Sequence, residues 1–213
     1  MRIIGGSRRG RRLRAPGSRF GTRVRPTSDR AREALFNIIA PEVRGGRVLD
    51  LFAGTGALGL EALSRGAEVA LFVEGGSEVI GLLRENLELC GFAGQARVLR
   101  HDCSRDLTFL SPLAPVGGFT LILADPPYGR GLAESTLKNL AGLIRAVDEG
   151  GGHSGEEGRA ASSRVLAPEG LLVLESGCDE KLPLEAGELA TCRESRSYGE
   201  ARFHFYCRKQ PQR

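Results

Sequence analysis

The stretch that decides the fold of this chain is RVLDLFAGTGALG, at residues 47–59. It passes from an apolar strand pattern into the spacing Gly54-x-Gly56-x-x-Gly59 and then into a helical segment. Glycines suit a sharp turn from strand to helix, because the backbone there takes positive φ and approaches a ligand closely. An acid, Glu74, follows Gly54 by twenty residues at the end of the next apolar run. The stretch therefore predicts a Rossmann-like α/β domain.

Apolar runs and helical patterns alternate along the rest of the chain, which is typical of a mostly parallel sheet. We expect strands at 48–51, 69–73, 97–99, 120–124 and 171–175, and helices at 58–64 and 78–90. The runs at 189–195 and 201–207 flank a turn at Tyr198-Gly199 and predict an antiparallel hairpin that closes a seven-stranded sheet. A further helix is expected to begin within 26–29, where the hydroxyls of Thr27 and Ser28 are candidate caps, and to end at Pro41. The catalytic domain would cover residues 26–213, with a flexible, glycine-rich insertion near 147–160.

Charge is distributed unevenly along the chain. Residues 1–28 contain nine arginines and no acidic residue, so the rest of the chain carries a net charge of −5 within the total of +4. Glycines and Pro16 interrupt this segment, and we expect residues 1–25 to form a hairpin extension that binds nucleic acid. The candidate RNA-binding residues are Arg8, Arg9, Arg11, Arg12, Arg25 and Arg30.

Several classes of protein are excluded by composition. No apolar run approaches the roughly 20 residues that span a bilayer, and the two isoleucines before Arg8 are too few for a secretory signal. The five cysteines are odd in number and widely spaced, without a Cys-x-x-Cys pair. This pattern disfavours a disulfide framework and a zinc site. We expect a cytoplasmic protein, without a metal, that acts as a monomer.

The glycine loop alone is compatible with NAD, with S-adenosylmethionine or with a turn that binds no ligand. Asp50 favours S-adenosylmethionine, because a carboxylate at this place suits the ammonium of a methionine group better than an anionic pyrophosphate. Gly54, Gly56 and the helix N-terminus would face the methionine carboxylate, and Glu74 the ribose hydroxyls. Asp102 either accepts from the adenine amine, with backbone from Cys103, or caps its loop; both interpretations stay open.

A second motif, Asp125-Pro126-Pro127-Tyr128, follows the run at 120–124. The prolines restrict the backbone, so the Asp125 carboxylate and the Pro126 carbonyl can be held toward a cleft. Two such acceptors would bind both N–H groups of an aromatic amine and turn its lone pair toward a methyl donor. Tyr128 would stack on the base. The motif predicts methyl transfer to an exocyclic amine.

The sequence disfavours some alternative functions and leaves others open. Methylation of cytosine C5 is disfavoured because none of the cysteines follows a proline, as its nucleophilic thiolate commonly does. A dehydrogenase would not use the Asp125 motif. Methylation of adenine N6 in RNA or DNA stays open, since the same motif serves that amine, and so does a non-catalytic ribosome-assembly factor.

The chain resembles the bacterial methyltransferases that modify N2 of guanine-966 in 16S ribosomal RNA. The resemblance rests on the segments at 1–6, 25–30, 33–37, 49–63, 72–74 and 125–128. It implies a class I methyltransferase fold with a small N-terminal hairpin, S-adenosylmethionine as cofactor, with Phe52 among its contacts, and a guanine of the small ribosomal subunit as substrate. The chain departs from the family at Gly75 and Gly76, where a polar residue usually follows the acid.

Overall fold

A computed structural model describes residues 1–15, 28–149 and 164–209. Along the chain the elements are the 3-10 helix η1 (Gly6–Arg8), α1 (Asp29–Ile38), α2 (Ala40–Val43), β1 (Arg47–Leu51), α3 (Ala57–Ser64), β2 (Val69–Glu74), α4 (Ser77–Cys90), η3 (Ala93–Gln95), β3 (Ala96–Arg100), η4 (Thr108–Leu113), β4 (Phe119–Ala124), α5 (Leu132–Glu149), β5 (Leu166–Gly177), β6 (Glu185–Ala186), β7 (Leu189–Tyr198) and β8 (Ala201–Arg208).

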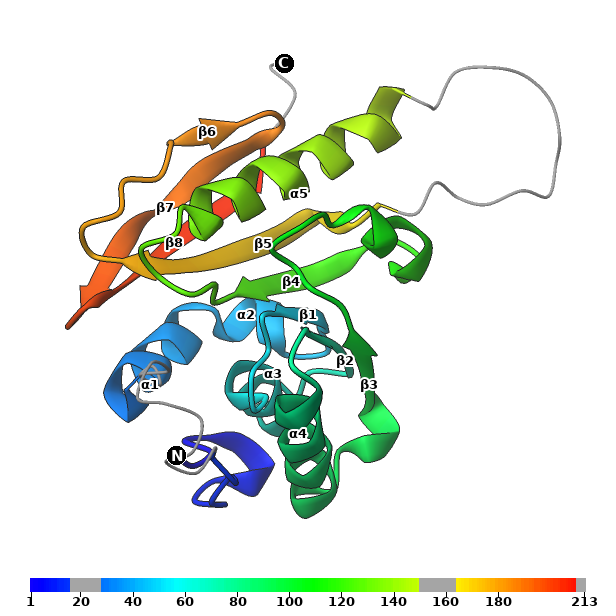
Figure 1. Cartoon of the computed structure of the whole chain (residues 1–213), viewed down its shortest axis with the longest axis vertical. Helices are drawn as coiled ribbons and strands as arrows, with labels where there is room; N and C mark the ends of the chain where they lie inside the picture. Colours follow the sequence, from blue (N-terminus) through cyan, green and yellow to red (C-terminus); the bar gives the residue numbers. More distant parts are fainter. Residues whose placement is uncertain (16–27, 150–163, 210–213) are drawn as a thin grey trace, which may run out of the picture.

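All the named strands belong to one sheet, in the order β3-β2-β1-β4-β5-β8-β7-β6 (Figure 1). The first five strands in this order are parallel, and β8, β7 and β6 are added antiparallel. The predicted α/β class and the C-terminal hairpin are therefore confirmed, but the predicted count of seven strands is wrong. The eighth strand, β6, has two residues, which is too short to produce a periodic pattern in sequence.

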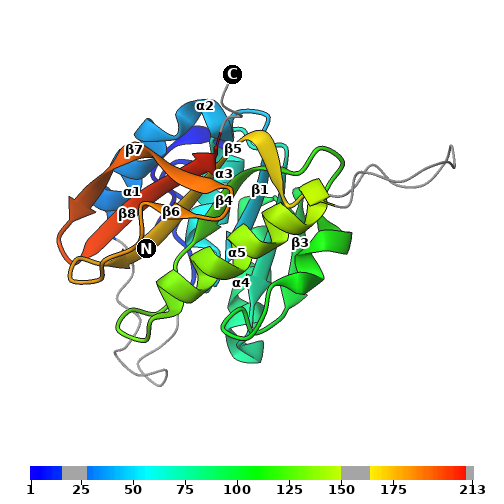
Figure 2. The same cartoon turned by 90° about the horizontal axis from the view of Figure 1, so that it is seen from above.

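Both faces of the sheet are covered by helices. Successive residues of a strand point to opposite faces, and in β4 Leu121 and Leu123 join one buried cluster whereas Ile122 and Ala124 join the other. The first cluster includes apolar residues of α1, α3 and α4, and the second those of α5 and η4. Accordingly, α5 lies on the side of the sheet opposite α1 and α3 (Figure 2). Burial on both faces explains why the parallel strands are almost continuously apolar.

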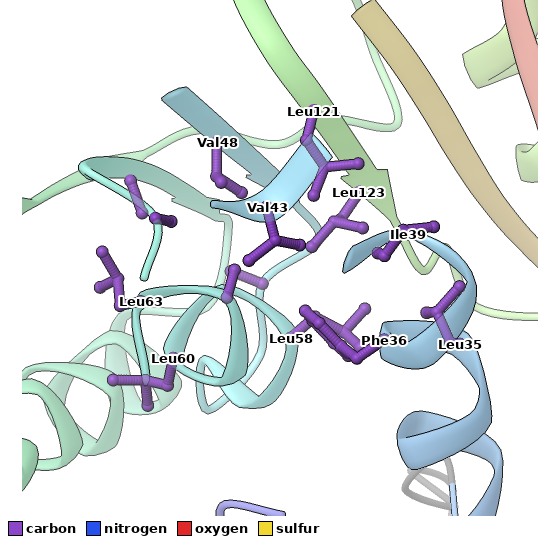
Figure 3. Close-up of a cluster of buried hydrophobic side chains, with 14 of the residues drawn as sticks. Leu35, Phe36, Ile39, Val43, Val48, Leu58, Leu60, Leu63, Leu121 and Leu123 are labelled. Atoms are coloured by element: carbon purple, nitrogen blue, oxygen red, sulfur yellow. The ribbon is translucent and has the colours of Figure 1, made fainter. Parts of the chain in front are cut away.

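The first cluster anchors the beginning of the chain to the sheet. Phe36 and Ile39 are fully buried and lie with Leu58 of α3 against Leu121 and Leu123 of β4 (Figure 3). The helix that supplies Phe36 begins as predicted, because the Ser28 hydroxyl accepts a hydrogen bond from the Ala31 amide at 3.1 Å.

Sequence reasoning did not locate α5, although its apolar residues recur at helical spacing: Ala133, Leu137, Leu140, Ala141 and Ile144 are all buried. This helix continues to Glu149, so the first residues of the predicted insertion are helical. The rest of the insertion lies outside the described residues. Among the helices that are described, none is long and apolar enough to cross a membrane.

Candidate active site

The carboxyl ends of β1, β4 and β5 bring acidic residues to one edge of the sheet. Ala124 of β4 pairs with Leu51 of β1 and with Leu174 of β5. Asp125 directly follows Ala124 at the end of β4, and Glu175 directly follows Leu174 in β5. The two acids are therefore neighbours that point to the same face of the sheet. The chain runs outward from β1 through β2 to β3, and in the other direction from β4 to β5, so the strand order reverses here. Open α/β sheets bind ligands at such a point.

The loop between β1 and α3 depends on glycine at two positions. Gly54 has φ of 55° and Gly56 has φ of 86°, in the left-handed region that favours glycine. A Cβ at Gly56 would lie 2.4 Å from Leu83 of α4, whereas a Cβ at Gly54 would meet nothing nearer than 3.9 Å. Position 56 therefore requires glycine, because any side chain would clash with Leu83, whereas Gly54 leaves open space at the surface of the loop.

Phe52 makes the turn out of β1. Its φ of 58° is the one positive value of a non-glycine residue in the described ranges, a conformation that costs roughly 1–3 kcal/mol and persists only when the surroundings enforce it. Its side chain packs against the second cluster. The strain lies beside the glycine loop, where a ligand site is expected.

Glu74 connects the glycine loop to the loop between β2 and α4. Its Oε2 accepts from the Gly54 amide at 2.9 Å and its Oε1 from the Gly76 amide at 2.7 Å. A carboxylate oxygen has a second lone pair, so each oxygen can also accept from a hydroxyl of a ligand. The side chain is half-buried, and this geometry suits the predicted contact with a ribose.

Asp50 lies beneath the glycine loop and is 1% exposed. Its Oδ2 accepts from the Gly59 amide, in the first turn of α3, at 2.8 Å. Burial raises the pKa of Asp50 to about 8, and the charge of Glu74 adds to this effect while the Gly59 hydrogen bond opposes it. A cation near the loop would favour the carboxylate form. The contact between Asp50 and an ammonium stays a prediction.

Asp102 and Cys103 follow β3. The Asp102 Oδ1 accepts from the Ser104 amide at 3.1 Å and from its hydroxyl at 2.6 Å, and these hydrogen bonds lower the pKa of Asp102. This is the loop-capping role that sequence left open. The other carboxylate oxygen, Oδ2, lies 3.3 Å from the Arg105 Nε in an exposed ion pair. Cys103 is buried, which raises the pKa of its thiol to about 12 and leaves it unsuited as a nucleophile.

The Asp125 motif leaves the sheet directly beside β1, where the Asp125 amide donates to the Leu51 carbonyl at 3.4 Å. Asp125 is half-buried and Pro126 is buried. Burial raises the pKa of Asp125 well above its usual value, and the negative charges of Glu175 and Asp50 add to the shift. Tyr128 stays 40% exposed. The structure thus brings the two sequence motifs together at one edge of the sheet.

Glu175 is a site residue that sequence reasoning missed. It is 2% exposed at the end of β5, and its Oε1 accepts a hydrogen bond from the Tyr128 hydroxyl. Its signal in the sequence is an acid that directly follows the apolar run 171–174. Two other acids of the site, Asp50 and Asp125, also follow apolar runs at the carboxyl ends of strands.

The N-terminal segment, residues 1–15, packs onto α3 and α4 as part of the domain. It folds back on itself through an antiparallel bridge between Arg2 and Arg12. Glu61 of α3 is fully buried and accepts from the Ile4 and Gly5 amides at 2.7 and 2.8 Å. On α4, Asn86 binds the backbone of residue 14 and also donates to the carbonyl of residue 55, in the glycine loop. The segment is joined to the structure that carries the site.

The predicted RNA-binding arginines differ in their surroundings. The Arg8 Nε donates to the Cys90 carbonyl at 2.7 Å, and the guanidinium lies 5.7 Å from the centre of the Phe92 ring. This side chain therefore contacts the end of α4 and the residues after it, although Arg8 is exposed. Arg8, Arg9, Arg11 and Arg12 together line a hollow of about 400 Å³. Arg30, on α1, is also exposed. Arg25 lies outside the described residues.

Comparison with known proteins identifies the family. A family model described as "Conserved hypothetical protein 95" matches residues 1–147. The chain is 36% identical to the putative rRNA methyltransferase YlbH of Bacillus subtilis, over 93% of this chain and 94% of the relative. It is 37% identical to the ribosomal RNA small subunit methyltransferase D of Escherichia coli K12, over 98% and 90%.

Solved structures agree with the sequence relatives. The putative methyltransferase yhhF from Escherichia coli superposes with a TM-score of 0.71 at 34% identity, covering 98% of both chains. The putative methylase HI0767 from Haemophilus influenzae gives a TM-score of 0.69 at 26% identity with the same coverage. Both superpositions cover nearly the whole of this chain. The chain therefore belongs to the Conserved hypothetical protein 95 family of methyltransferases, together with the small subunit methyltransferase D proteins.

Proposed function

We propose that this protein transfers a methyl group from S-adenosylmethionine to the exocyclic N2 amine of a guanine in 16S ribosomal RNA of the small subunit. The observation that carries the proposal is the position of Asp125, half-buried beside Asp50 at the switch point of the sheet and at the edge of the glycine loop. The small subunit as the source of the RNA is supported by the similarity to ribosomal RNA small subunit methyltransferase D.

The residues around the glycine loop fit S-adenosylmethionine, the cofactor expected of a methyltransferase. The open space at Gly54 can take the methionine carboxylate near the N-terminus of α3, and Glu74 can accept from the ribose hydroxyls. Asp50 provides negative charge beneath the ammonium, and Asp102 and Phe52 would border the adenosine. When bound, the cofactor supplies a methyl group that is activated by its positively charged sulfur.

On the substrate side, this chain's residues orient the amine and receive its proton. The Asp125 carboxylate and the Pro126 carbonyl each accept one N–H of the guanine amine, which turns the nitrogen lone pair toward the methyl carbon. As the new N–C bond forms, the carbon–sulfur bond breaks and its electron pair stays on sulfur. Asp125 stabilises the positive charge that develops on nitrogen. The proton then leaves to Asp125, whose raised pKa makes it a competent base, and from there to water.

The exposed arginines of the N-terminal segment are proposed to bind the phosphates of the RNA. Arg9, Arg11 and Arg12 line one hollow, and a cluster of guanidinium groups attracts phosphate at long range. Arg8 lines the same hollow and also contacts residues 90 and 92, so we assign it both phosphate binding and packing. Arg25 and Arg30 remain candidates for the same role, and residues 26–213 would form the catalytic domain of a monomer.

The test supplies labelled S-adenosylmethionine with unmodified small subunits, naked 16S RNA and DNA in separate reactions, and then maps the labelled nucleotide. We expect label on guanine N2 in the small subunit. Asp125→Ala should abolish transfer while the dissociation constant of the cofactor stays nearly unchanged, because Asp125 acts on the substrate side. An equal loss of methyl transfer and cofactor binding would contradict the substrate-side role of Asp125.

Two other outcomes correspond to the competing functions. Label on adenine N6 would mean that the motif serves adenine, whose amine presents the same pair of N–H groups. Binding to small subunits without transfer or cofactor binding would identify a non-catalytic assembly factor. The open glycine loop and the raised pKa of Asp50 favour an enzyme over that last possibility.

A further inference from the structure

We propose that Glu175 is a positioning residue, which holds the Tyr128 side chain at the edge of the methyl-transfer site through the hydrogen bond from the Tyr128 hydroxyl. The proposal rests on the proposed function of the Asp125 motif and adds to it a residue outside both sequence motifs. Prolines restrict the backbone of the motif, but they do not determine where the Tyr128 ring points.

The place of Glu175 is determined by the sheet. Leu174 pairs with Ala124 of β4 on one side and with His204 of β8 on the other, so the end of β5 is held by both neighbouring strands. Glu175 itself is 2% exposed. Its carboxylate is a fixed acceptor, in contrast to the acceptors that a surface loop would supply.

Other contacts hold the motif against the segment that follows β5. A Cβ at Gly177 would lie 3.7 Å from the Tyr128 ring, which leaves room for the ring but little more. The Gly129 amide donates to a carboxylate oxygen of Glu180. The Tyr128 side chain is therefore fixed at its hydroxyl end, while 40% of the residue stays exposed and available to a base. A ring held in advance loses less conformational freedom when a base stacks on it.

Stability alone does not favour an acid at this position. Glu175 adds negative charge beside Asp125 and raises the pKa of that residue, and burying like charges together is unfavourable. Such clusters are typical of functional sites. Burial, the negative charge of Glu175 and this hydrogen bond all raise the pKa of Tyr128, so the phenol remains a donor throughout the physiological pH range.

The experiment measures kcat and KM for unmodified small subunits, with the full chain and labelled S-adenosylmethionine, in five variants. Tyr128→Phe removes the donor, Glu175→Ala removes the acceptor, and Glu175→Gln keeps an acceptor oxygen without its charge. The double variant Tyr128→Phe/Glu175→Ala tests whether the two residues act as a unit. Glu169→Ala is the matched control, because Glu169 is an exposed acid on the same strand. The cofactor dissociation constant reports the integrity of the fold.

Tyr128→Phe and Glu175→Ala should each lower kcat/KM by roughly 10-fold to 100-fold, as expected for loss of a hydrogen bond to a charged group. The loss of kcat/KM in the double variant should be no larger than the loss in the less active of the two single variants. Glu175→Gln should retain more activity than Glu175→Ala. Full activity of Tyr128→Phe, or additive losses in the double variant, would overturn the proposal. If Glu175→Ala does not fold, Tyr128→Phe and Glu175→Gln decide the question by themselves.

Failure of the proposed function is distinguished by Asp125→Ala in the same assay. An active Asp125→Ala enzyme would refute the role of the motif, and the role of Glu175 with it. An inactive Asp125→Ala enzyme together with fully active Tyr128 and Glu175 variants would refute only the positioning role.

Discussion

Glu61 joins the N-terminal segment to the body of the domain, and replacing it with alanine should destabilise the protein strongly. The side chain is fully buried. It accepts from the Ile4 and Gly5 amides at 2.7 and 2.8 Å and from the Arg65 Nε at 2.7 Å, and the Arg32 Nε lies 3.9 Å away. Glu61→Ala would leave two backbone amides and the Arg65 Nε without their acceptor, and it would remove the negative charge beside the buried Arg32 guanidinium.

The expected cost is about 3–5 kcal/mol in the free energy of unfolding, which is typical when one partner of a buried ion pair is removed. Glu61→Gln should cost less, because its amide oxygen still accepts from one or two of the donors. Urea unfolding followed by far-UV circular dichroism measures both values, and the chain contains no tryptophan that would offer a simpler fluorescence signal. Glu88→Ala, at an exposed position on α4, is the control and should change stability by less than about 0.5 kcal/mol.

Hydrogen exchange tests the mechanism behind this value. The Ile4 and Gly5 amides should be protected in the wild type and should exchange much faster in Glu61→Ala, whereas amides of β1 and β4 should change only as far as global stability changes. The reasoning is refuted if Glu61→Ala unfolds within about 1 kcal/mol of the wild type, or if these two amides keep their protection.

Three further predictions concern the cofactor site and the N-terminal arginines. Burial raises the pKa of Asp50 to about 8, so the residue is mostly protonated at pH 7, and a bound cation should displace its proton. Calorimetry in buffers of different ionisation enthalpy should therefore show proton release on cofactor binding. This release should be absent in Asp50→Asn. Asn86→Ala should weaken cofactor binding several-fold and expose residues 1–15 to exchange, because Asn86 binds both this segment and the glycine loop; unchanged cofactor affinity would contradict this coupling. Replacing Arg9, Arg11 and Arg12 together should reduce the magnitude of the slope of log K against log salt concentration for RNA binding, by roughly 0.7–0.9 for each charge removed. Arg8→Ala should reduce this slope too, and should also lower thermal stability because its contacts with Cys90 and Phe92 are lost.

The two motifs illustrate how far sequence could predict the site. The turn at Gly54 and Gly56 and the rigid motif at Asp125 are local features, whose residue types are dictated by backbone geometry within a few positions. Their convergence follows from a general property of parallel sheets, that the carboxyl ends of the strands meet at one edge. Asp125 and Asp50 could therefore be predicted as neighbours without a structure.

The N-terminal segment shows where sequence prediction stops. Its nine arginines suggested one RNA-binding extension, yet the described ones differ in their contacts: Arg8, Arg9 and Arg11 are all exposed, but the Arg8 guanidinium also contacts Cys90 and Phe92. A guanidinium carries the same charge in either environment, so composition cannot separate the two roles. Only the position of α4 decides them.

By itself, the sequence determined the α/β class, the mostly parallel sheet, the methyltransferase motifs and the C-terminal hairpin. These features follow from hydrophobic periodicity and from turns, which depend on residues close together in the chain. The tertiary structure decided the pairing of Tyr128 with Glu175, the burial of Glu61 beneath the N-terminal segment and the two-residue strand β6. Each of these joins residues far apart in sequence or too few to form a pattern, so the contact exists only after the sheet and its helices have assembled.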